Sequence, residues 1–71
     1  MAVYLITYER FDPKGPQGDR LLNRLHELGA VRIHKSQWIC SGDAGQAGMI
    51  YDQIAPFVPG RTGLLVEEIS R

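Results

Sequence analysis

The hydrophobic positions of this chain fall into short runs separated by clusters of glycine, proline and polar residues. The first run, residues 2–8, is apolar at nearly every position and rich in β-branched and aromatic residues, which is typical of a strand buried on both faces. Its alternate positions form two sets, Tyr4, Ile6 and Tyr8, and Val3, Leu5, Thr7 and Glu9. The first set stays large, whereas the second turns polar. We therefore predict a central strand whose first set faces helices and whose second set lies on an open face that something else covers near Val3 and Leu5.

The next segment predicts a loop followed by a helix. Residues 10–18 contain two prolines and two glycines, which favour a loop. We expect Asp19 to accept hydrogen bonds from the first free amides of a helix. An apolar face follows at helical spacing, formed by Leu21, Leu22, Leu25 and Leu28. Gly29 is expected to end this helix in a left-handed conformation.

A second helix is predicted to start at Asp43, which forms a capping box with Gln46. Its apolar stripe consists of Ala47, Ile50, Ile54 and Phe57. Gly45 and Gly48 weaken its early turns. Pro56 lacks an amide hydrogen and is expected to end the regular hydrogen bonding.

Three more strands are indicated. Residues 30–35 alternate with period two, so we expect Val31 and Ile33 to face the core while Arg32 and His34 face outward. The apolar run 38–40 follows after an interval short enough for a hairpin. The last run, residues 63–69, begins apolar and then mixes acidic with apolar positions.

The predicted order is strand, helix, strand, strand, helix, strand, the split βαβ arrangement. Right-handed crossovers place both helices on one face and the first and third strands in the middle. The fold class is therefore α+β, a ferredoxin-like βαββαβ domain spanning residues 1–71, with two helices on one face of a four-stranded antiparallel sheet.

The length of the chain favours self-association. A domain of 71 residues buries a thin core, and small folds usually compensate with disulfides, a structural metal or oligomerisation. Cys40 is the single cysteine, so no intrachain disulfide can form. Cys40, His26 and His34 do not make a paired zinc motif. Self-association remains, and we expect a homodimer.

Charge and targeting signals narrow the function classes. Eight basic and eight acidic residues cancel, so no global field draws the chain to nucleic acid or to an anionic membrane, and a nucleic-acid contact has to be local. No signal segment is visible, and the apolar start is too short for a membrane helix. With its free cysteine, the chain is expected to be a soluble cytoplasmic protein.

Several short motifs resemble one family. They are Tyr4-Leu5-Ile6-Thr7-Tyr8 followed by an acid, then Leu28-Gly29, then Lys35-Ser36-Gln37-Trp38-Ile39, then Pro56-Phe57. With these motifs the chain resembles the CRISPR-associated protein 2 superfamily, and more closely its short stand-alone branch, often labelled SinR-like. The resemblance spans nearly the whole chain and is built of common residue patterns.

The resemblance implies a ferredoxin-like homodimer whose open sheet faces pack together. In the superfamily an Asp ends the first strand, and one from each subunit holds a divalent metal for phosphodiester cleavage. That position is Glu9 here, and the family's Ser before the third strand matches Ser36. The fifth strand of longer relatives is not present in this sequence, so a role in CRISPR adaptation is less expected.

The candidate chemistry follows from these positions. Two copies of Glu9, helped by Asp12, are expected to hold magnesium or manganese and to activate water against an RNA or DNA phosphodiester. The alternative is that Glu9 is a solvated residue at a strand end. A local phosphate-binding patch is formed by Arg10, Lys14, Arg32, His34, Lys35 and Ser36. The alternative for the charged members of this patch is that they keep the sheet edge soluble.

Two further functions stay open beside the nuclease. One is a non-catalytic dimeric module for nucleic-acid binding or protein assembly, and the other is a small-molecule-sensing dimer. The aromatic, basic signature of RNA recognition motifs is absent. Trp38 is therefore expected in the core or in an interface, and Cys40 is expected to be a small buried hydrophobe.

Overall fold

The computed structural model describes residues 1–9, 15–61 and 63–70. In chain order its elements are β1 (Ala2–Thr7), α1 (Gly15–Glu27), β2 (Val31–His34), β3 (Gln37–Gly42), α2 (Ala47–Ile54), the short 3₁₀ helices η1 (Ala55–Phe57) and η2 (Pro59–Arg61), and β4 (Leu65–Ser70). The predicted order of strands and helices is confirmed. None of the helices in these ranges is long and apolar enough to cross a membrane.

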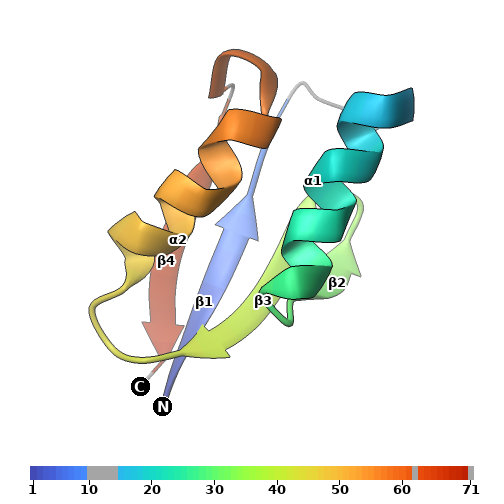
Figure 1. The fold of residues 1–71 in the computed structure, drawn as a ribbon. Helices are drawn as coiled ribbons and strands as arrows, with labels where there is room; N and C mark the ends of the chain where they lie inside the picture. The colour runs from blue at the N-terminus through green and yellow to red at the C-terminus, as the bar shows by residue number, and fades with distance from the viewer. Residues whose placement is uncertain (10–14, 62, 71) are drawn as a thin grey trace.

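The four strands form one antiparallel sheet in the order β2-β3-β1-β4. β1 and β3 occupy the centre, as predicted for a split βαβ chain. Both helices lie on the same side of this sheet, with α1 toward β3 and β2 and α2 toward β4 (Figure 1). The ferredoxin-like α+β architecture is therefore confirmed, and one face of the sheet is left without helices.

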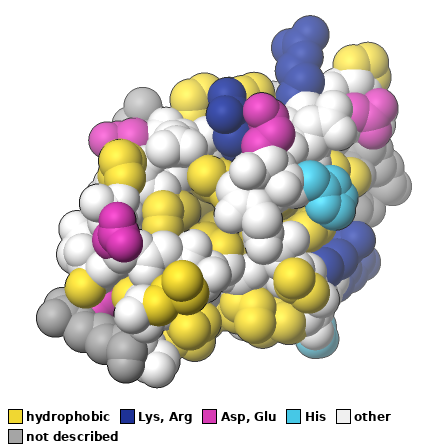
Figure 2. Space-filling model, turned by 60° about the horizontal axis from the view of Figure 1, so that its bottom comes forward, with side chains coloured by type: hydrophobic (Ala, Val, Ile, Leu, Met, Phe, Trp, Pro, Cys, Tyr) yellow, Lys and Arg dark blue, Asp and Glu magenta, His cyan; other side chains and the backbone are white. Residues whose placement is uncertain are grey.

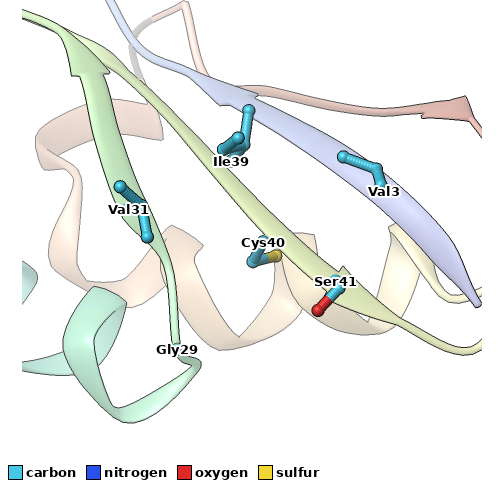
Figure 3. Close-up of a pocket in the computed structure, with 6 residues that line it drawn as sticks. All are labelled: Val3, Gly29, Val31, Ile39, Cys40 and Ser41. Carbon is cyan, nitrogen blue, oxygen red and sulfur yellow. The ribbon is translucent and has the colours of Figure 1, made fainter.

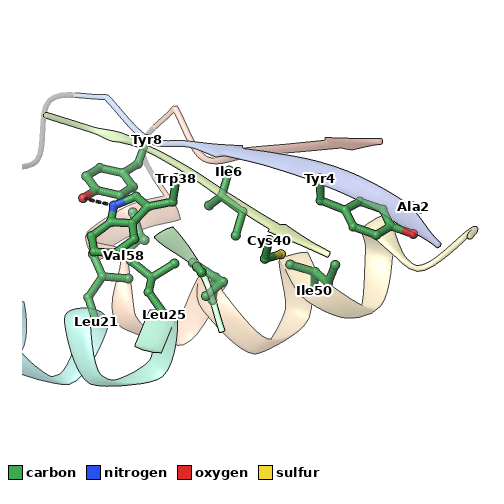
Figure 4. Close-up of a cluster of buried hydrophobic side chains, with 12 residues drawn as sticks. Ala2, Tyr4, Ile6, Tyr8, Leu21, Leu25, Trp38, Cys40, Ile50 and Val58 are labelled. Carbon is green, nitrogen blue, oxygen red and sulfur yellow. Dashed lines mark hydrogen bonds between the residues drawn. The ribbon is translucent and has the colours of Figure 1, made fainter. Parts of the chain in front are cut away.

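The core lies between the sheet and the two helices (Figure 4). Its fully buried large side chains are Tyr4, Ile6, Tyr8, Leu21, Leu25 and Ile54. The first three are the alternate β1 positions that were expected to face the helices. Trp38 is also buried there, and its Nε1–H donates a hydrogen bond of 3.2 Å to the Tyr8 hydroxyl. Buried polar groups need such partners, so the aromatic tips are paired with each other.

α1 begins earlier than the glycine and proline content suggested. It starts at Gly15, so the predicted loop is wrong over residues 15–18, and residues 10–14 lie outside the described part. Proline is tolerated in the first helical turn, where an amide hydrogen would have no intrahelical acceptor, and Pro16 takes that place. Asp19 is consequently an exposed residue inside the helix and not its N-cap.

The end of α1 is the predicted one. Gly29 adopts φ 73°, a left-handed conformation that favours glycine. Its amide donates to the His26 carbonyl at 2.9 Å, and the Ala30 amide donates to the Leu25 carbonyl at 2.9 Å. This pair of hydrogen bonds is the Schellman motif, and it turns the chain sharply into β2.

The start of α2 corrects the predicted capping box. The helix begins at Ala47, and Gln46 precedes it with no side-chain capping bond. The two residues that precede the helix are instead bonded to the sheet: the Gly45 N–H donates to Glu68 Oε1 at 2.7 Å, and the Gln46 N–H donates to the Tyr4 hydroxyl at 2.9 Å. The Tyr4 hydroxyl in turn hydrogen-bonds the Asp43 carbonyl and Glu68 Oε1. Residues far apart in sequence therefore hold the segment from which this helix starts.

The remaining apolar positions of α2 follow the prediction. Ile50 and Ile54 are buried, while Ala47 and Phe57 pack against the core from its margin. Regular α-helical structure ends at Ile54, and η1 carries Pro56.

The prediction of which β2 side chains face the core is wrong. Val31 pairs with Ile39, and Arg32 pairs with Trp38, whose side chain lies in the core. Paired residues in a sheet share a face, so Arg32 lies on the helix side and Val31 on the open side. Val31 is 62% exposed and Ile33 is 51% exposed in the single chain. The expected inward positions are thus the ones that this chain leaves uncovered.

Candidate functional site

The candidate site is the helix-free side of the sheet, called here the open face. The strand register places Val31, Ile39, Leu5 and Glu67 in one row across all four strands. A second row holds Gln37, Thr7 and Leu65, and a third begins with Ser41 and Val3. We define the open face by these residues: Val3, Leu5, Thr7, Val31, Gln37, Ile39, Ser41, Leu65 and Glu67.

The open face is apolar at its centre and polar at its rim. Val3, Leu5 and Ile39 are half-buried by their neighbours alone, and Leu65 on the outer strand is 51% exposed. Glu67 is the one charged residue in the set that we defined. Figure 2, in which the bottom of the fold comes forward, shows hydrophobic side chains gathered along the lower side of the view, while most Lys and Arg side chains lie elsewhere. Contiguous apolar surface of this kind marks an interaction site more often than a solvated face.

A pocket of about 190 Å³ lies at the β2 end of this face. It forms because β2 starts at Val31, whereas β3 continues to Gly42, so the last residues of β3 have no neighbour on that side. Val3, Val31 and Ile39 line it together with the Gly29 turn (Figure 3). Its polar side chain is Ser41. A pocket of this composition fits an aliphatic side chain better than a charged ligand.

Glu9 lies just beyond the end of β1, and its side chain is exposed. A Cβ atom added to Gly63 would lie 2.6 Å from Glu9 Cβ, so the stem of Glu9 packs directly on the turn before β4. Gly63 has φ 61°, which also favours glycine. The close packing holds the stem of Glu9 against the turn that precedes β4.

Glu9 belongs to no metal-binding cluster of three or more side chains within the described residues. Residues 1–9, 15–61 and 63–70 contain no cluster of three or more His, Cys, Asp or Glu side chains able to hold a metal. Asp12, its expected helper, falls in residues 10–14 outside the described structure. Magnesium is commonly held by one or two carboxylates with water and substrate oxygens. One chain therefore contributes a single carboxylate here, and a second copy would supply the other.

Of the expected phosphate-binding patch, the structure describes Arg32, His34, Lys35 and Ser36. The Arg32 guanidinium donates from Nη2 to the Lys35 carbonyl at 2.6 Å and from Nε to the His34 carbonyl at 3.3 Å. It also lies 5.7 Å from the centre of the Trp38 ring, at cation–π distance. Arg32 therefore hydrogen-bonds to the β2–β3 turn from the helix side of the sheet. His34 and Lys35 are exposed, while Ser36 is half-buried and its carbonyl accepts from the Tyr8 amide at 3.2 Å. Arg10 and Lys14 lie outside the described residues.

Trp38 and Cys40 are core residues, as expected. The edge of the His26 ring lies against Trp38, with ring centroids 5.8 Å apart. Burial raises the pKa of the Cys40 thiol above its ordinary value. A reactive cysteine requires the opposite shift, so Cys40 serves packing.

Two residues of importance escaped the sequence analysis. Val31 belongs to the open face, and Glu68 accepts a hydrogen bond from the Gly45 N–H just before α2. The sequence alone does not show that Glu68 lies opposite Tyr4, because that follows from the pairing register of β1 and β4. Comparison of the chain with protein-family models, curated proteins and solved structures gave no match.

Proposed function

We propose that this protein works as a homodimer in which two open faces pack together, and that the pair forms an assembly module related to the CRISPR-associated protein 2 superfamily. The observation that carries the proposal is the apolar row from Val31 through Ile39 to Leu5, which no described element of the same chain covers. The resemblance in sequence motifs supports the same arrangement. We also infer a cytoplasmic location from the free Cys40, since thiols persist in reducing compartments.

The size of the face supports a copy of the chain as its occupant. Four strands about 4.8 Å apart, with about six residues of about 3.3 Å each, give a footprint of about 400 Å², and corrugated side chains expose more than this. Small specific interfaces bury about 600 Å² per partner. The open face supplies most of such an area. A two-fold axis along the strands would lay Ile39 of one copy over Leu5 of the other and keep each Glu67 at the hydrated rim.

The first experiment measures the mass of the protein in solution. Analytical ultracentrifugation of the wild type is expected to give twice the 8.0 kDa chain mass. Val31→Asp places a charge in the apolar row at a residue that is already 62% exposed in the monomer, so it is expected to dissociate the dimer without unfolding the chain. Met49→Asp is the matched control, because Met49 is 49% exposed on α2, away from the open face. A monomeric wild type at millimolar concentration would contradict the proposal.

A second candidate function is metal-dependent cleavage of RNA or DNA. It is favoured by Glu9, an exposed residue two positions beyond the end of β1, whose stem is packed on the turn before β4. In a dimer formed through this face, two Glu9 carboxylates would hold magnesium or manganese, which supplies a Lewis acid and an activated water when bound. The dimer itself does not depend on this chemistry.

The cleavage hypothesis is tested with labelled RNA and duplex DNA in the presence of manganese, magnesium or a chelator. Glu9→Gln is expected to abolish cleavage and to leave the dimer intact. Val31→Asp is expected to abolish both, because it separates the two carboxylates. Cleavage that persists in Glu9→Gln would assign the activity to another site or to a contaminant. A salt-sensitive shift without cleavage would favour the nucleic-acid-binding module instead.

A further inference from the structure

The two edges of the sheet are built differently. β2 has four residues and a register shift between Arg32 and His34. Arg32 donates to the carbonyls of His34 and Lys35, so donors already occupy backbone acceptors at that edge. A short, irregular and basic edge strand resists pairing with another chain. The β2 edge is therefore poorly suited to pairing with a strand of another chain.

β4 is the opposite case. It has six residues and pairs with β1 in continuous register from Leu65 opposite Thr7 to Glu68 opposite Tyr4, with the irregularity confined to its far end. It is the last strand of the sheet, so its outer side faces no other strand of the described chain. An edge strand presents unpaired N–H and C=O groups on that side. Leu65 and Ile69, 51% and 53% exposed, flank two consecutive acids.

The acidic residues of β4 indicate which kind of strand could pair with this edge. Glu67 forms no ion pair with any residue that the structure describes, and Glu68 beside it is a second acid. β4 could pair antiparallel with β4 of another copy. Two registers give the largest overlap while they keep the open faces of both sheets on the same side. One places Glu67 opposite Glu67, and the other places Glu68 opposite Glu68. Like charges directly opposite each other destabilise a strand pair, so the register that pairs the two Glu67 carboxylates is disfavoured. A strand that brings a cation to Glu67 is the better occupant, while the Glu68 carboxylate is already held by the Gly45 N–H and the Tyr4 hydroxyl.

We infer that the outer edge of β4 is a docking site for an extended, basic segment of a different protein, which adds a fifth strand to the sheet. Backbone hydrogen bonds to the free edge supply affinity, and a Lys or Arg opposite Glu67 supplies specificity. Apolar residues two positions away on the same side of the added strand meet Leu65 and the Ile69 region. The backbone of the added strand lies beside β4 in the plane of the sheet, and its side chains opposite Leu65 and Glu67 lie at the rim of the open face.

The test uses two synthetic ten-residue peptides that carry Thr on one face of the strand and Val, a central charged residue and Val on the other face. The central residue is Lys in one peptide and Glu in the other. In NMR titrations of the isotope-labelled full chain, the Lys peptide is expected to shift the amide signals of Leu65–Ser70 and not those of Val31–His34. Glu67→Lys is expected to weaken binding of the Lys peptide about tenfold, since an attractive cross-strand pair becomes repulsive. The same variant is expected to bind the Glu peptide better than the wild type does, and this gain shows that the variant is folded.

Four outcomes would overturn the inference. They are equal binding of both peptides by the wild type, shifts centred on β2, unchanged affinity in Glu67→Lys, and no shift with either peptide at millimolar concentration. Val31→Asp serves as a second background. It removes the proposed dimer contact but should leave peptide binding unchanged, so failure of the dimer and failure of the edge site give different results.

Discussion

The two faces of the sheet are both apolar, yet only one of them is built as a core. The helix face carries aromatic residues whose polar tips are paired, as in the hydrogen bond from Trp38 to the Tyr8 hydroxyl. The open face carries medium-sized aliphatic residues such as Val31, Ile39 and Leu5, which have no polar atoms to satisfy. The first face therefore specifies one internal arrangement, whereas the second suits an aliphatic contact with another molecule. The first face forms the core of the fold, and the second is the face through which we propose that the chain assembles.

The largest expected difference between the two faces is the loss in unfolding free energy when a leucine is replaced by alanine. Leu25→Ala removes a fully buried side chain from the helix side, and we expect a loss of about 2 to 5 kcal/mol in the free energy of unfolding. Leu65→Ala removes the same atoms from a residue that is 51% exposed, and we expect less than about 1 kcal/mol in the monomer. Urea denaturation at low micromolar concentration measures both. Equal losses would mean that the open face is already covered within one chain.

The second-largest expected effect concerns the hydroxyl group of Tyr4, whose ring lies on the helix side of the sheet. Tyr4→Phe keeps the ring in the core but leaves the Gln46 amide without its acceptor and removes a hydrogen bond to Glu68. An unsatisfied buried polar group costs about 1 to 3 kcal/mol, and we expect a destabilisation in that range. Hydrogen exchange should show faster exchange of the Gln46 and Gly45 amides, with little change at the C-terminal end of α1. Uniformly faster exchange would mean that the network does not act locally on α2.

The sequence predicted the helix face well because burial there follows directly from alternation. Tyr4, Ile6 and Tyr8 were assigned correctly, and so were the glycine that ends α1 and the order of the elements. Alternation in residues 30–35 showed which positions share a face but not which face is covered, because a shift of one residue in register exchanges the two sides. Val31 was therefore placed on the wrong side.

The helix starts were missed for a related reason. Caps were expected from residues near each helix, whereas the start of α2 is held by Tyr4, which lies 39 and 42 positions from its partners Asp43 and Gln46, and by Glu68, which lies 23 positions from Gly45. Such long-range contacts follow from tertiary structure alone. For the candidate site, the sequence indicated that the apolar residues near Val3 and Leu5 lie on a face without helices (Figure 1), while the role of Glu9 stays a prediction. It did not anticipate that Arg32 binds its own turn, because that contact depends on the β2–β3 pairing.

A smaller effect is expected from protein concentration, which tests the open face directly. If two copies bind through this face, each tenfold rise in protein concentration should stabilise the folded dimer by about 1.4 kcal/mol. The thermal midpoint of the wild type should therefore rise with concentration in calorimetry. Val31→Asp should remove this dependence, and Met49→Asp should retain it. A midpoint that is independent of concentration in the wild type would leave the apolar row without its proposed partner.

The smallest effect compares two neighbouring residues of β3 that face opposite sides. Burial raises the pKa of the Cys40 thiol, so the unfolded chain ionises this thiol at lower pH than the folded chain does. The contribution of Cys40 to stability is therefore complete below the ordinary thiol pKa of about 8.5, and it falls as the pH rises above that value. The difference in unfolding free energy between the wild type and Cys40→Ala should shrink above pH 8.5 and stay constant below it.

Thiol labelling extends this comparison to the open face. Cys40 should react slowly with an aromatic disulfide reagent at neutral pH, because it is buried and protonated. In the double variant Cys40→Ala with Ser41→Cys, the thiol moves to an exposed position that lines the open-face pocket, and it should react rapidly in the dilute protein. Raising the protein concentration should slow its reaction as the second copy covers the face. Rapid labelling at every concentration would show that this part of the face stays in water, and the proposed interface would then have to exclude the end of β3.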